Sequence, residues 1–300
     1  MNNTTNTPMV SVCMITYNHE AYIGEAIEGV LMQKANFPFK LIIGEDHSTD
    51  NTRAICEKYA AKHPDVIELL PKEEINLGMM PNFIKTLKVC KGKYIALCEG
   101  DDYWIDENKL QMQVDFLEEN EEYSLVFTNR HILNPSGILS NSIGTIDTYT
   151  KDDILKGFIP WTQTILLRNN KIIPSFLRKH NQCPSGDRLI SYICSTLGPL
   201  KRLDNITAVY RDSGYGVWSS IPVKDKLKTS TERYIDFINM VKPNNSTELI
   251  NLKINKAKLE FLRKKPISYI INMIYDNIFT KRTSFTLFLF NSFTKKYLKS

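Results

Sequence analysis

Buried strands and amphipathic helices alternate through the first hundred residues of this chain, and each strand leads into a polar loop. Residues 9–15 form a continuous apolar run, which is typical of a buried strand. Residues 21–33 then place apolar side chains at helical spacing. The same order recurs, with predicted strands at 39–43, 66–70 and 94–98 and predicted helices at 51–62 and 82–90. This alternation predicts an α/β fold with a mostly parallel central sheet flanked by helices.

The remainder of the chain is less regular. A helix is predicted at about 107–119, with Lys109 on its polar face. The further predictions are strands at 123–129, 162–168 and 206–210, a helix at 187–197 and an irregular segment at 138–160. From about residue 224 onward the pattern is helical, broken at two prolines. We therefore expect one α/β domain over residues 1–220 and a helical C-terminal region over 221–300.

The composition is that of an ordinary globular protein, with 42% hydrophobic and 24% charged residues. The polar opening MNNTTNTPM predicts no signal peptide, and the apolar run at 285–290 is too short to span a bilayer. The six cysteines include no CxxC pair. We therefore expect reduced, buried thiols in a cytoplasmic protein, without a zinc site.

Charge is distributed unevenly along the chain. Residues 1–220 carry 22 Lys and Arg against 27 Asp and Glu, whereas residues 221–300 carry 16 against 6. The basic region also contains aromatic residues in helical patterns, and basic amphipathic helices bind anionic membrane surfaces. We expect a peripheral contact with the inner membrane through this region. A solvated helical face, packing on the first domain or contact with a second protomer are the alternatives, and the oligomeric state is left open. Nothing in the charge pattern suggests a nucleic-acid partner.

Two polar loops follow the first two predicted strands. In an open parallel sheet, ligands bind where loops leave the carboxyl ends of the strands. Thr16, Tyr17 and Asn18 offer a hydroxyl, an aromatic ring and an amide, which suit stacking and hydrogen bonding to a flat ring. Asp46 stands at the end of the next strand, where it can accept hydrogen bonds from a base or ribose. Asn18 and the later residues of the second loop could instead cap helices.

The segment CEGDDYW at 98–104 places three acids around one glycine, directly after the fourth predicted strand. Helix-dipole stabilisation can explain acids slightly later in the chain, but not Glu99, Asp101 and Asp102, which precede the predicted helix. Closely spaced carboxylates suit a hard divalent cation that keeps positions open for diphosphate oxygens. We therefore expect a Mg²⁺ or Mn²⁺ site at this edge of the sheet.

With these segments identified, the chain resembles the family 2 glycosyltransferases of the GT-A fold. The resemblance rests on VSVCMITYN, EDHSTDNT, NLGMMPNF, GKYIALCEGDDYW with the following KLQMQVDFLE, SGDRL and VYRDSGYGVWS. These segments cover about residues 9 to 220 in the family's order. The resemblance implies a Rossmann-like sheet, with a nucleotide-sugar-binding half at about 9–102 and an acceptor-binding half at about 103–220.

The resemblance also implies an activity. Such enzymes transfer a sugar from a nucleotide diphosphate donor, usually a UDP-sugar, to an acceptor hydroxyl with inversion, as in the assembly of bacterial surface polysaccharides. The expected partners are therefore a nucleotide-sugar donor and a glycan or lipid-linked sugar acceptor. The expected cofactor is Mn²⁺ or Mg²⁺.

Individual residues receive roles from the same match. Asp102 corresponds to the metal ligand of the DXD-type motif, Asp101 to a contact with donor ribose or sugar, and Asp187 to the catalytic base. Tyr17 corresponds to the residue that stacks on the base and Asp46 to the acid that hydrogen-bonds it. The other expected donor contacts are Thr16, Asn18 and Asn76. Apart from the match, Trp104 and Trp218 are expected acceptor contacts because aromatic rings pack well against sugars, although either could instead lie in the core. From the residues alone, Asp187 could equally cap the helix that follows it.

The sequence departs from the family pattern at three points. Glu99 stands where an aspartate is usual, Ser213 stands where many relatives have a histidine, and the QxxRW signature of processive synthases is absent. The last point favours a single-addition transferase. The loss of the histidine leaves its role vacant or taken by Asp212, and leaves open a non-catalytic sugar-nucleotide-binding protein. A nucleotidyltransferase would need a glycine-rich basic loop after the first strand, which TYNHE is not.

Overall fold

In a computed structural model of the chain, the described residues are 7–137, 139–183, 185–214, 216, 220–251 and 253. The chain divides into two compact units, Met1–Ser246 and Thr247–Ser300. The first unit holds every element discussed below and extends beyond residue 220, because it includes the helix α8 (Val223–Val241). The predicted basic helices after residue 253 lie outside the described residues.

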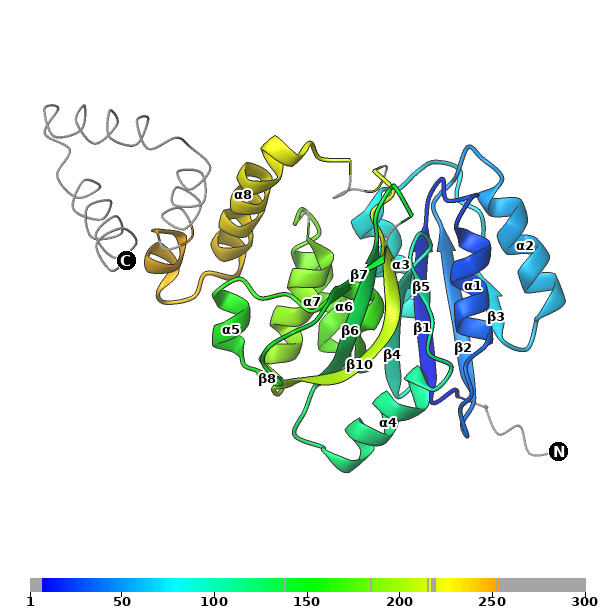
Figure 1. The fold of residues 1–300 in the computed structure, drawn as a ribbon, viewed down its shortest axis with the longest axis horizontal. Coiled ribbons are helices and arrows are strands. Elements are labelled where there is room, and N and C mark those ends of the chain that lie inside the picture. Colours follow the sequence, from blue (N-terminus) through cyan, green and yellow to red (C-terminus); the bar gives the residue numbers. More distant parts are fainter. Residues whose placement is uncertain are drawn as a thin grey trace, which may run out of the picture. The chain divides into compact units, whose positions relative to one another are not determined.

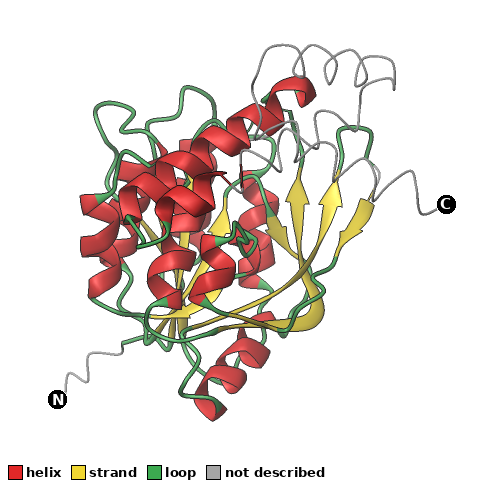
Figure 2. Cartoon of the chain, turned by 90° about the vertical axis from the view of Figure 1, so that its left-hand side faces the viewer, coloured by secondary structure: helices red, strands yellow, loops and turns green. Residues whose placement is uncertain are grey.

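The first unit is built on one ten-stranded sheet, seen with the helices around it in Figure 1 and after a quarter turn in Figure 2. Its main path runs β3-β2-β1-β4-β9-β6-β10-β5, with β7 paired to β6 and β8 paired to β10. The strands are β1 (Val10–Thr16), β2 (Phe39–Glu45), β3 (Ile67–Leu69), β4 (Tyr94–Glu99), β5 (Tyr103–Trp104), β6 (Leu125–Leu133), β7 (Leu139–Ser142), β8 (Thr148–Tyr149), β9 (Leu166–Arg168) and β10 (Leu200–Arg211).

The sheet is mixed but mostly parallel along its N-terminal half. Strands β1 to β4 pair in parallel, as the alternation of strands and helices predicts. Strand β9 runs antiparallel between β4 and β6, and β10 returns parallel to β6. The helices are α1 (Ile23–Leu31), α2 (Thr52–Lys62), α3 (Met79–Val89), α4 (Lys109–Glu119), α5 (Lys151–Leu155), α6 (Ile172–Lys179), α7 (Gly186–Ser195) and α8, with a 3₁₀ turn at Thr162–Thr164.

Helices cover both faces of the sheet because the strands bury side chains on both sides. Apolar residues of α1 and α4, including Ile27 and Leu110, join one side of β1, β2 and β4 in a single core cluster. Helix α3 packs against β1 and β2. Its approach depends on Gly44, since a Cβ there would lie 1.9 Å from Thr86 Oγ1.

Lys109 does not lie on a polar face, contrary to the sequence prediction. Its side chain is fully buried, and Nζ donates to Gln113 Oε1 at 2.7 Å and lies 4.2 Å from the centre of a Trp104 ring. Burial lowers the pKa of Lys109 to about 7. The helix α4 turns this position inward because Leu110, Gln113 and Val114 face the sheet together with it.

The segment 138–160 also differs from its predicted irregular structure, because it contains β7, β8 and α5. Helix α5 begins at a capping box, in which Thr150 N and Oγ1 donate to Asp153 Oδ2. These elements are short, and the two strands form only by pairing with β6 and β10. Among the described residues, no helix is long and apolar enough to cross a membrane.

Candidate functional site

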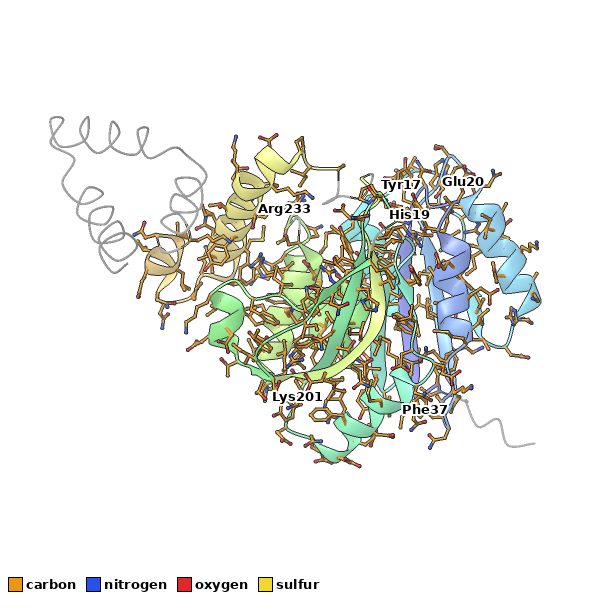
Figure 3. The ribbon with its side chains drawn as sticks, viewed as in Figure 1. Tyr17, His19, Glu20, Phe37, Lys201 and Arg233 are labelled. Carbon is orange, nitrogen blue, oxygen red and sulfur yellow. The ribbon has the colours of Figure 1, made fainter. Side chains whose placement is uncertain are left out.

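The predicted site residues gather at one edge of the sheet. Parallel register places Thr16 opposite Glu45, and Ile15 opposite Glu99. The loops that follow β1, β2 and β4 therefore leave the sheet side by side, as the sequence predicts. Figure 3 shows Tyr17, His19 and Glu20 at this edge, with Phe37 and Lys201 at the opposite end.

The first two loops are bonded to each other by side chains. Asn18, which has a φ of 54°, donates its backbone N–H to Ser48 Oγ at 3.0 Å and accepts the Thr49 N–H on Oδ1 at 2.8 Å. Glu20 N donates to Asp50 Oδ2 at 3.0 Å. The Tyr17 ring between these contacts stays 42% exposed. The loops thus form a rigid frame around an aromatic ring that is free to stack.

Asp46 ties a third loop to this frame. It is 3% exposed, and its two carboxylate oxygens accept the backbone N–H groups of Leu77 and Gly78 at 2.8 and 2.9 Å. The Asn76 side chain donates to the Asp46 carbonyl at 2.8 Å. Asp46 and Asn76, both predicted as donor contacts, therefore meet, and their contacts in the structure hold the loop before α3 in place.

The acid segment packs closely on the end of β1. A Cβ on Gly100 would lie 2.5 Å from Thr16 Oγ1, so the glycine is required for this approach. Asp102 is 1% exposed, and its Oδ1 accepts the Arg211 N–H at 2.9 Å. Its Oδ2 is buried and has no hydrogen-bond partner among the described residues. Asp102 is therefore oriented by one oxygen while the other remains unused.

Arg211 fastens the acid segment to two other elements. Its Nε donates to the Asp101 carbonyl at 3.1 Å, and its guanidinium forms an ion pair with Glu25 of α1. The same group lies over the rings of Tyr22 and Tyr103, at 4.7 and 5.0 Å. The sequence match covers Arg211 but assigns it no role, because its partners come from parts of the chain far apart in sequence.

The acids of this segment repel one another in the absence of a cation. Burial raises the pKa of Asp102 well above its usual range, and the charges of Asp101 and Glu99 raise it further. Burial also raises the pKa of Glu99 to about 8, with contributions from Asp101 and Asp187. A cation bound here would reverse both effects.

The residues present fit a divalent cation of the magnesium type. Across the described part of the chain, no three His, Cys, Asp or Glu side chains converge as a metal cage. Mg²⁺ commonly binds to one or two carboxylates and completes its shell with water and substrate phosphates, so such a cage is not required. The unused, buried Oδ2 of Asp102 is the protein oxygen that suits this role.

Asp187 lies in the first turn of α7. Its Oδ1 accepts the Arg188 N–H at 2.7 Å, and its charge acts on Glu99 and on Arg130 of β6. Arg188 lies 5.5 Å from the rings of both Tyr234 and Phe237, so α8 packs beside the residue that follows Asp187. The fold thus brings Asp187 near the acids, as the resemblance implies.

The predicted acceptor contacts are not supported in the same way. Trp104 is 2% exposed, and its indole N–H donates to the Gln163 carbonyl at 2.8 Å. The structure places it in the core instead of an acceptor pocket, because strand pairing with Ala208 turns it toward the buried cluster. Trp218 lies outside the described residues.

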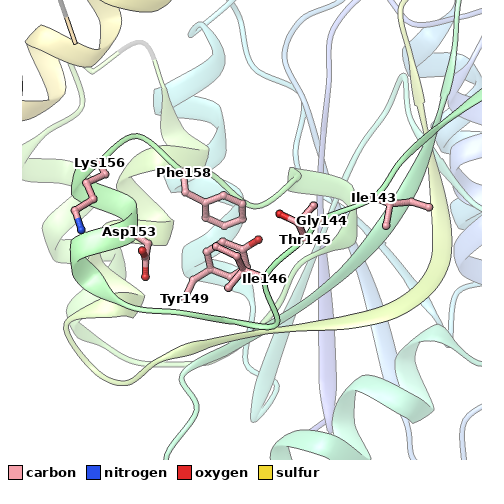
Figure 4. Close-up of a pocket in the computed structure, with 8 residues that line it drawn as sticks. All are labelled: Ile143, Gly144, Thr145, Ile146, Tyr149, Asp153, Lys156 and Phe158. Carbon is pink, nitrogen blue, oxygen red and sulfur yellow. The ribbon is translucent and has the colours of Figure 1, made fainter. Parts of the chain in front are cut away.

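A separate pocket of about 340 Å³ lies away from this site, in the region of β7, β8 and α5 (Figure 4). It is lined by Ile143, Gly144, Thr145, Ile146, Tyr149, Asp153, Lys156 and Phe158. The rings of Tyr149 and Phe158 stack at 3.7 Å in its wall. It contains none of the predicted site residues.

Comparisons with known proteins find relatives of similar sequence. The chain is 29% identical over 215 residues to the uncharacterized protein Rv1520 of Mycobacterium tuberculosis, covering 70% of this chain and 61% of that protein. It is 32% identical over 161 residues to TuaG of Bacillus subtilis, named for teichuronic acid biosynthesis, covering 53% and 62% of the two chains. The chain thus spans about three fifths of the length of these relatives.

Solved structures share the fold. Residues 1–349 of Staphylococcus aureus TarS in complex with UDP-GlcNAc align with a TM-score of 0.58 and 20% identity, over 82% of this chain and 71% of that one. The mannosyltransferase PcManGT from Pyrobaculum calidifontis, in complex with GDP-Man and Mn²⁺, aligns with a TM-score of 0.54 and 13% identity, over 99% and 89%. The GT-A fold expected from the sequence is thereby confirmed.

The family is assigned from a family model that matches the sequence of this chain directly. The model of the family described as "Glycosyl transferase family 2" matches residues 11–170, more than half of the sequence. The matched range contains the loops after β1 and β2 and the whole acid segment. The chain therefore belongs to glycosyltransferase family 2.

Proposed function

We propose that this protein transfers a sugar from a nucleotide diphosphate sugar to an acceptor hydroxyl, with inversion and with the help of a divalent cation. The observation that carries the proposal is the hydrogen bonding and burial of the Asp102 carboxylate. One carboxylate oxygen is held by Arg211 N, while the other is buried and unused at the edge where three loops meet. Family membership supports the same reaction class.

The donor base would bind in the frame formed by the first three loops. The exposed ring of Tyr17 would stack on it, with Thr16 and Asn18 beside the ring. The Asp46 carboxylate has lone pairs beyond those used by Leu77 and Gly78, so it could also accept a hydrogen bond from the base. Asn76 and Asp101 complete the proposed donor contacts.

Asp102 would hold a Mn²⁺ or Mg²⁺ ion through its free oxygen. When bound, such an ion neutralises charge that builds on the leaving diphosphate. The protein's own part is to fix the carboxylate through Arg211 and to keep it in a buried place, where electrostatic interactions are strong. The solved relative that contains Mn²⁺ supports a cation of this class.

Asp187 would act on the acceptor side. A carboxylate there can take the proton from the attacking hydroxyl as the bond to the anomeric carbon forms. A single displacement between a base on one side and a leaving group on the other inverts the anomeric centre. The proximity of Asp187 to the acid segment, where its charge acts on Glu99, supports this role.

The finer parts of the proposal concern substrates and domains. We take a UDP-sugar as the donor, which the complex of the similar TarS structure with UDP-GlcNAc supports. We take surface polysaccharide or a related glycan as the product, which the similarity to TuaG, named for teichuronic acid biosynthesis, supports. We keep residues 9–102 as the donor half and 103–220 as the acceptor half of the catalytic domain. Docking of the basic C-terminal helices on an anionic membrane stays a prediction, because those residues lie outside the described ranges.

A thermal-shift screen of UDP-, GDP- and dTDP-sugars, with and without Mn²⁺, tests the proposal. A ligand that binds the folded state raises the melting temperature, and at equal concentration a tighter ligand raises it more. We expect at least one nucleotide sugar to stabilise the protein, more strongly with Mn²⁺, and the Asp102→Asn variant to lose the Mn²⁺-dependent part. No stabilisation by any nucleotide would contradict the proposal.

A binding protein without catalysis is the second candidate, because Ser213 replaces the histidine of many relatives. Its prediction differs in one respect. Such a protein would show the same stabilisation by a nucleotide sugar, but neither transfer to any acceptor nor slow donor hydrolysis. Product analysis with the donor that stabilises most strongly separates the two candidates.

A further inference from the structure

Arg130 occupies an unusual position in β6. Its backbone is fixed between two strands, opposite Ala208 of β10 and Ser142 of β7. Its guanidinium lies 5.2 Å from a Trp161 ring and 4.5 Å from the Tyr210 ring. Two aromatic neighbours restrain a planar cation without using its N–H groups, which point outward along its edge.

The donors of Arg130 are unused in the described structure. Within the described residues its side chain makes no hydrogen bond, and its Nε is buried without a partner. An arginine side chain carries five N–H donors and no acceptor, and buried donors without partners are costly. A group that supplies oxygen acceptors would remove this cost.

Strand register places Arg130 near the acid segment, because Arg130 lies opposite Ala208 and Ala208 lies opposite Trp104, two residues after Asp102. Burial lowers its pKa, and the carboxylates of Asp102, Glu99 and Asp187 oppose that effect. The charges of Asp101 and Asp187 both raise the pKa of Glu99. Its carboxylate also accepts no hydrogen bond in the described part of the chain. An unused donor set on β6 and an unused acceptor in the acid segment are thus close enough for their charges to interact, and Asp187 of α7 acts on both.

The position of Arg130 suits a contact with the transferred sugar, an inference that rests on the proposed function. In a direct displacement, the transferred sugar must lie between the leaving diphosphate, near Asp102, and the acceptor hydroxyl, near Asp187. We propose that Arg130 is a specificity-determining residue, which donates hydrogen bonds to hydroxyl or amide oxygens of the transferred sugar. Glu99 accepts a hydrogen bond from a hydroxyl of the same sugar. Trp161 and Tyr210 hold the guanidinium plane in place.

Arg130→Gln, Arg130→Lys and Glu99→Gln test this assignment in the full-length protein. The affinity for sugar-free UDP with Mn²⁺ is measured by calorimetry, and kcat/KM is measured for two UDP-hexoses that differ at one hydroxyl. If another nucleotide proves to be preferred, its diphosphate and epimeric sugars replace these. The exposed Arg178 of α6 supplies the matched control, Arg178→Gln.

We expect Arg130→Gln to bind UDP within about threefold of wild type. Its kcat/KM for the preferred sugar should fall about 10- to 100-fold, and the preference over the epimer should shrink, because a site built to hydrogen-bond a substrate loses discrimination with its donor. Glu99→Gln should reduce the preference in the same way. Arg130→Lys keeps the charge but not the planar fork, so it should restore little of the preference.

Three results would overturn the assignment. They are a fall in UDP affinity as large as the fall in kcat/KM, an unchanged preference between the two sugars, or full recovery with Arg130→Lys. The last would show that Arg130 only balances the charge of the acids. Should Arg130→Gln fail to fold, Glu99→Gln and Arg130→Lys decide the matter. If wild type neither binds nor turns over any nucleotide sugar, the proposed function fails instead.

Discussion

Replacing Asp46 should destabilise the protein and weaken nucleotide binding together. The two carboxylate oxygens of Asp46 accept N–H groups from Leu77 and Gly78, and the side chain is 3% exposed. A hydrogen bond to a charged group contributes about 1.5–3 kcal/mol to stability. Loss of both bonds in Asp46→Ala, with some compensation by water, should lower the free energy of unfolding by about 3 kcal/mol. Asp46→Asn keeps one acceptor oxygen and should lose about half as much.

Equilibrium unfolding in urea, followed by circular dichroism, measures the change in stability. The exposed Asp65, in the turn before β3, gives the matched control Asp65→Ala, which should change stability by less than about 0.5 kcal/mol. Calorimetry with the nucleotide that binds wild type most tightly should show at least about a tenfold weaker affinity for Asp46→Ala, because the loop at 76–78 is released.

The change in stability and the change in nucleotide affinity, measured together, test whether Asp46 holds the loop before α3. If Asp46 served only to bond the base, Asp46→Ala would lose affinity while its stability stayed within about 0.5 kcal/mol of wild type. That result would refute a role for Asp46 in holding the loop before α3.

Three further perturbations follow from particular contacts. Gly100→Ala should abolish the Mn²⁺-dependent thermal shift with nucleotide, because the added Cβ would lie 2.5 Å from Thr16 Oγ1. The control variant Gly24→Ala should keep that shift, because its Cβ would meet no atom closer than 3.8 Å. Because the pKa of Lys109 is about 7 when folded and near its ordinary value when unfolded, the unfolded state binds the extra proton between these values. Lys109 should therefore add stability from pH 7 to pH 9, by up to about 1.4 kcal/mol per pH unit, measured in urea titrations as the difference between wild type and Lys109→Met. The raised pKa values of Glu99 and Asp102 act in the opposite direction, but they are common to both proteins. Phe237→Ala should cost about 3–5 kcal/mol in the same assay, because the ring is fully buried; a cost below about 1 kcal/mol would contradict the packing of α8 in the first unit.

The N-terminal half of the fold can be predicted from sequence because its signals are local. Strand β1 was expected at 9–15 and is Val10–Thr16, and β2 and β4 begin at the predicted residues. Their apolar runs are long, and each is followed by a polar loop. Strands β7 and β8 gave no such signal, since they form by pairing with β6 and β10. Strand β10 begins at Leu200 rather than 206, because its first half is held by pairing with β6 and β8.

The site, like the fold, contains residues that local sequence signals reveal and residues that only the folded structure reveals. Thr16, Asp46 and Asp102 could be found from sequence, because each stands at or just after the end of a predicted strand. Arg130 and Arg211 could not be given roles, since their neighbours come from distant segments that the pairing of β10 with β6 and with β5 helps to bring together. The aromatic character of Trp104 was compatible with an acceptor contact or with the core, and only the pairing of β5 with β10 and the burial of the side chain place it in the core.

The most direct test of the central claim compares wild type with Asp187→Asn in one assay. Both proteins receive the same nucleotide sugar, chosen by thermal shift, and release of nucleotide diphosphate is followed by chromatography together with nucleotide affinity by calorimetry. We expect Asp187→Asn to bind nucleotide as wild type does, and to release product at least about a hundredfold more slowly because the base is lost. Equal turnover by the two proteins would contradict the assignment of Asp187 as the base, and with it the proposed arrangement of the site.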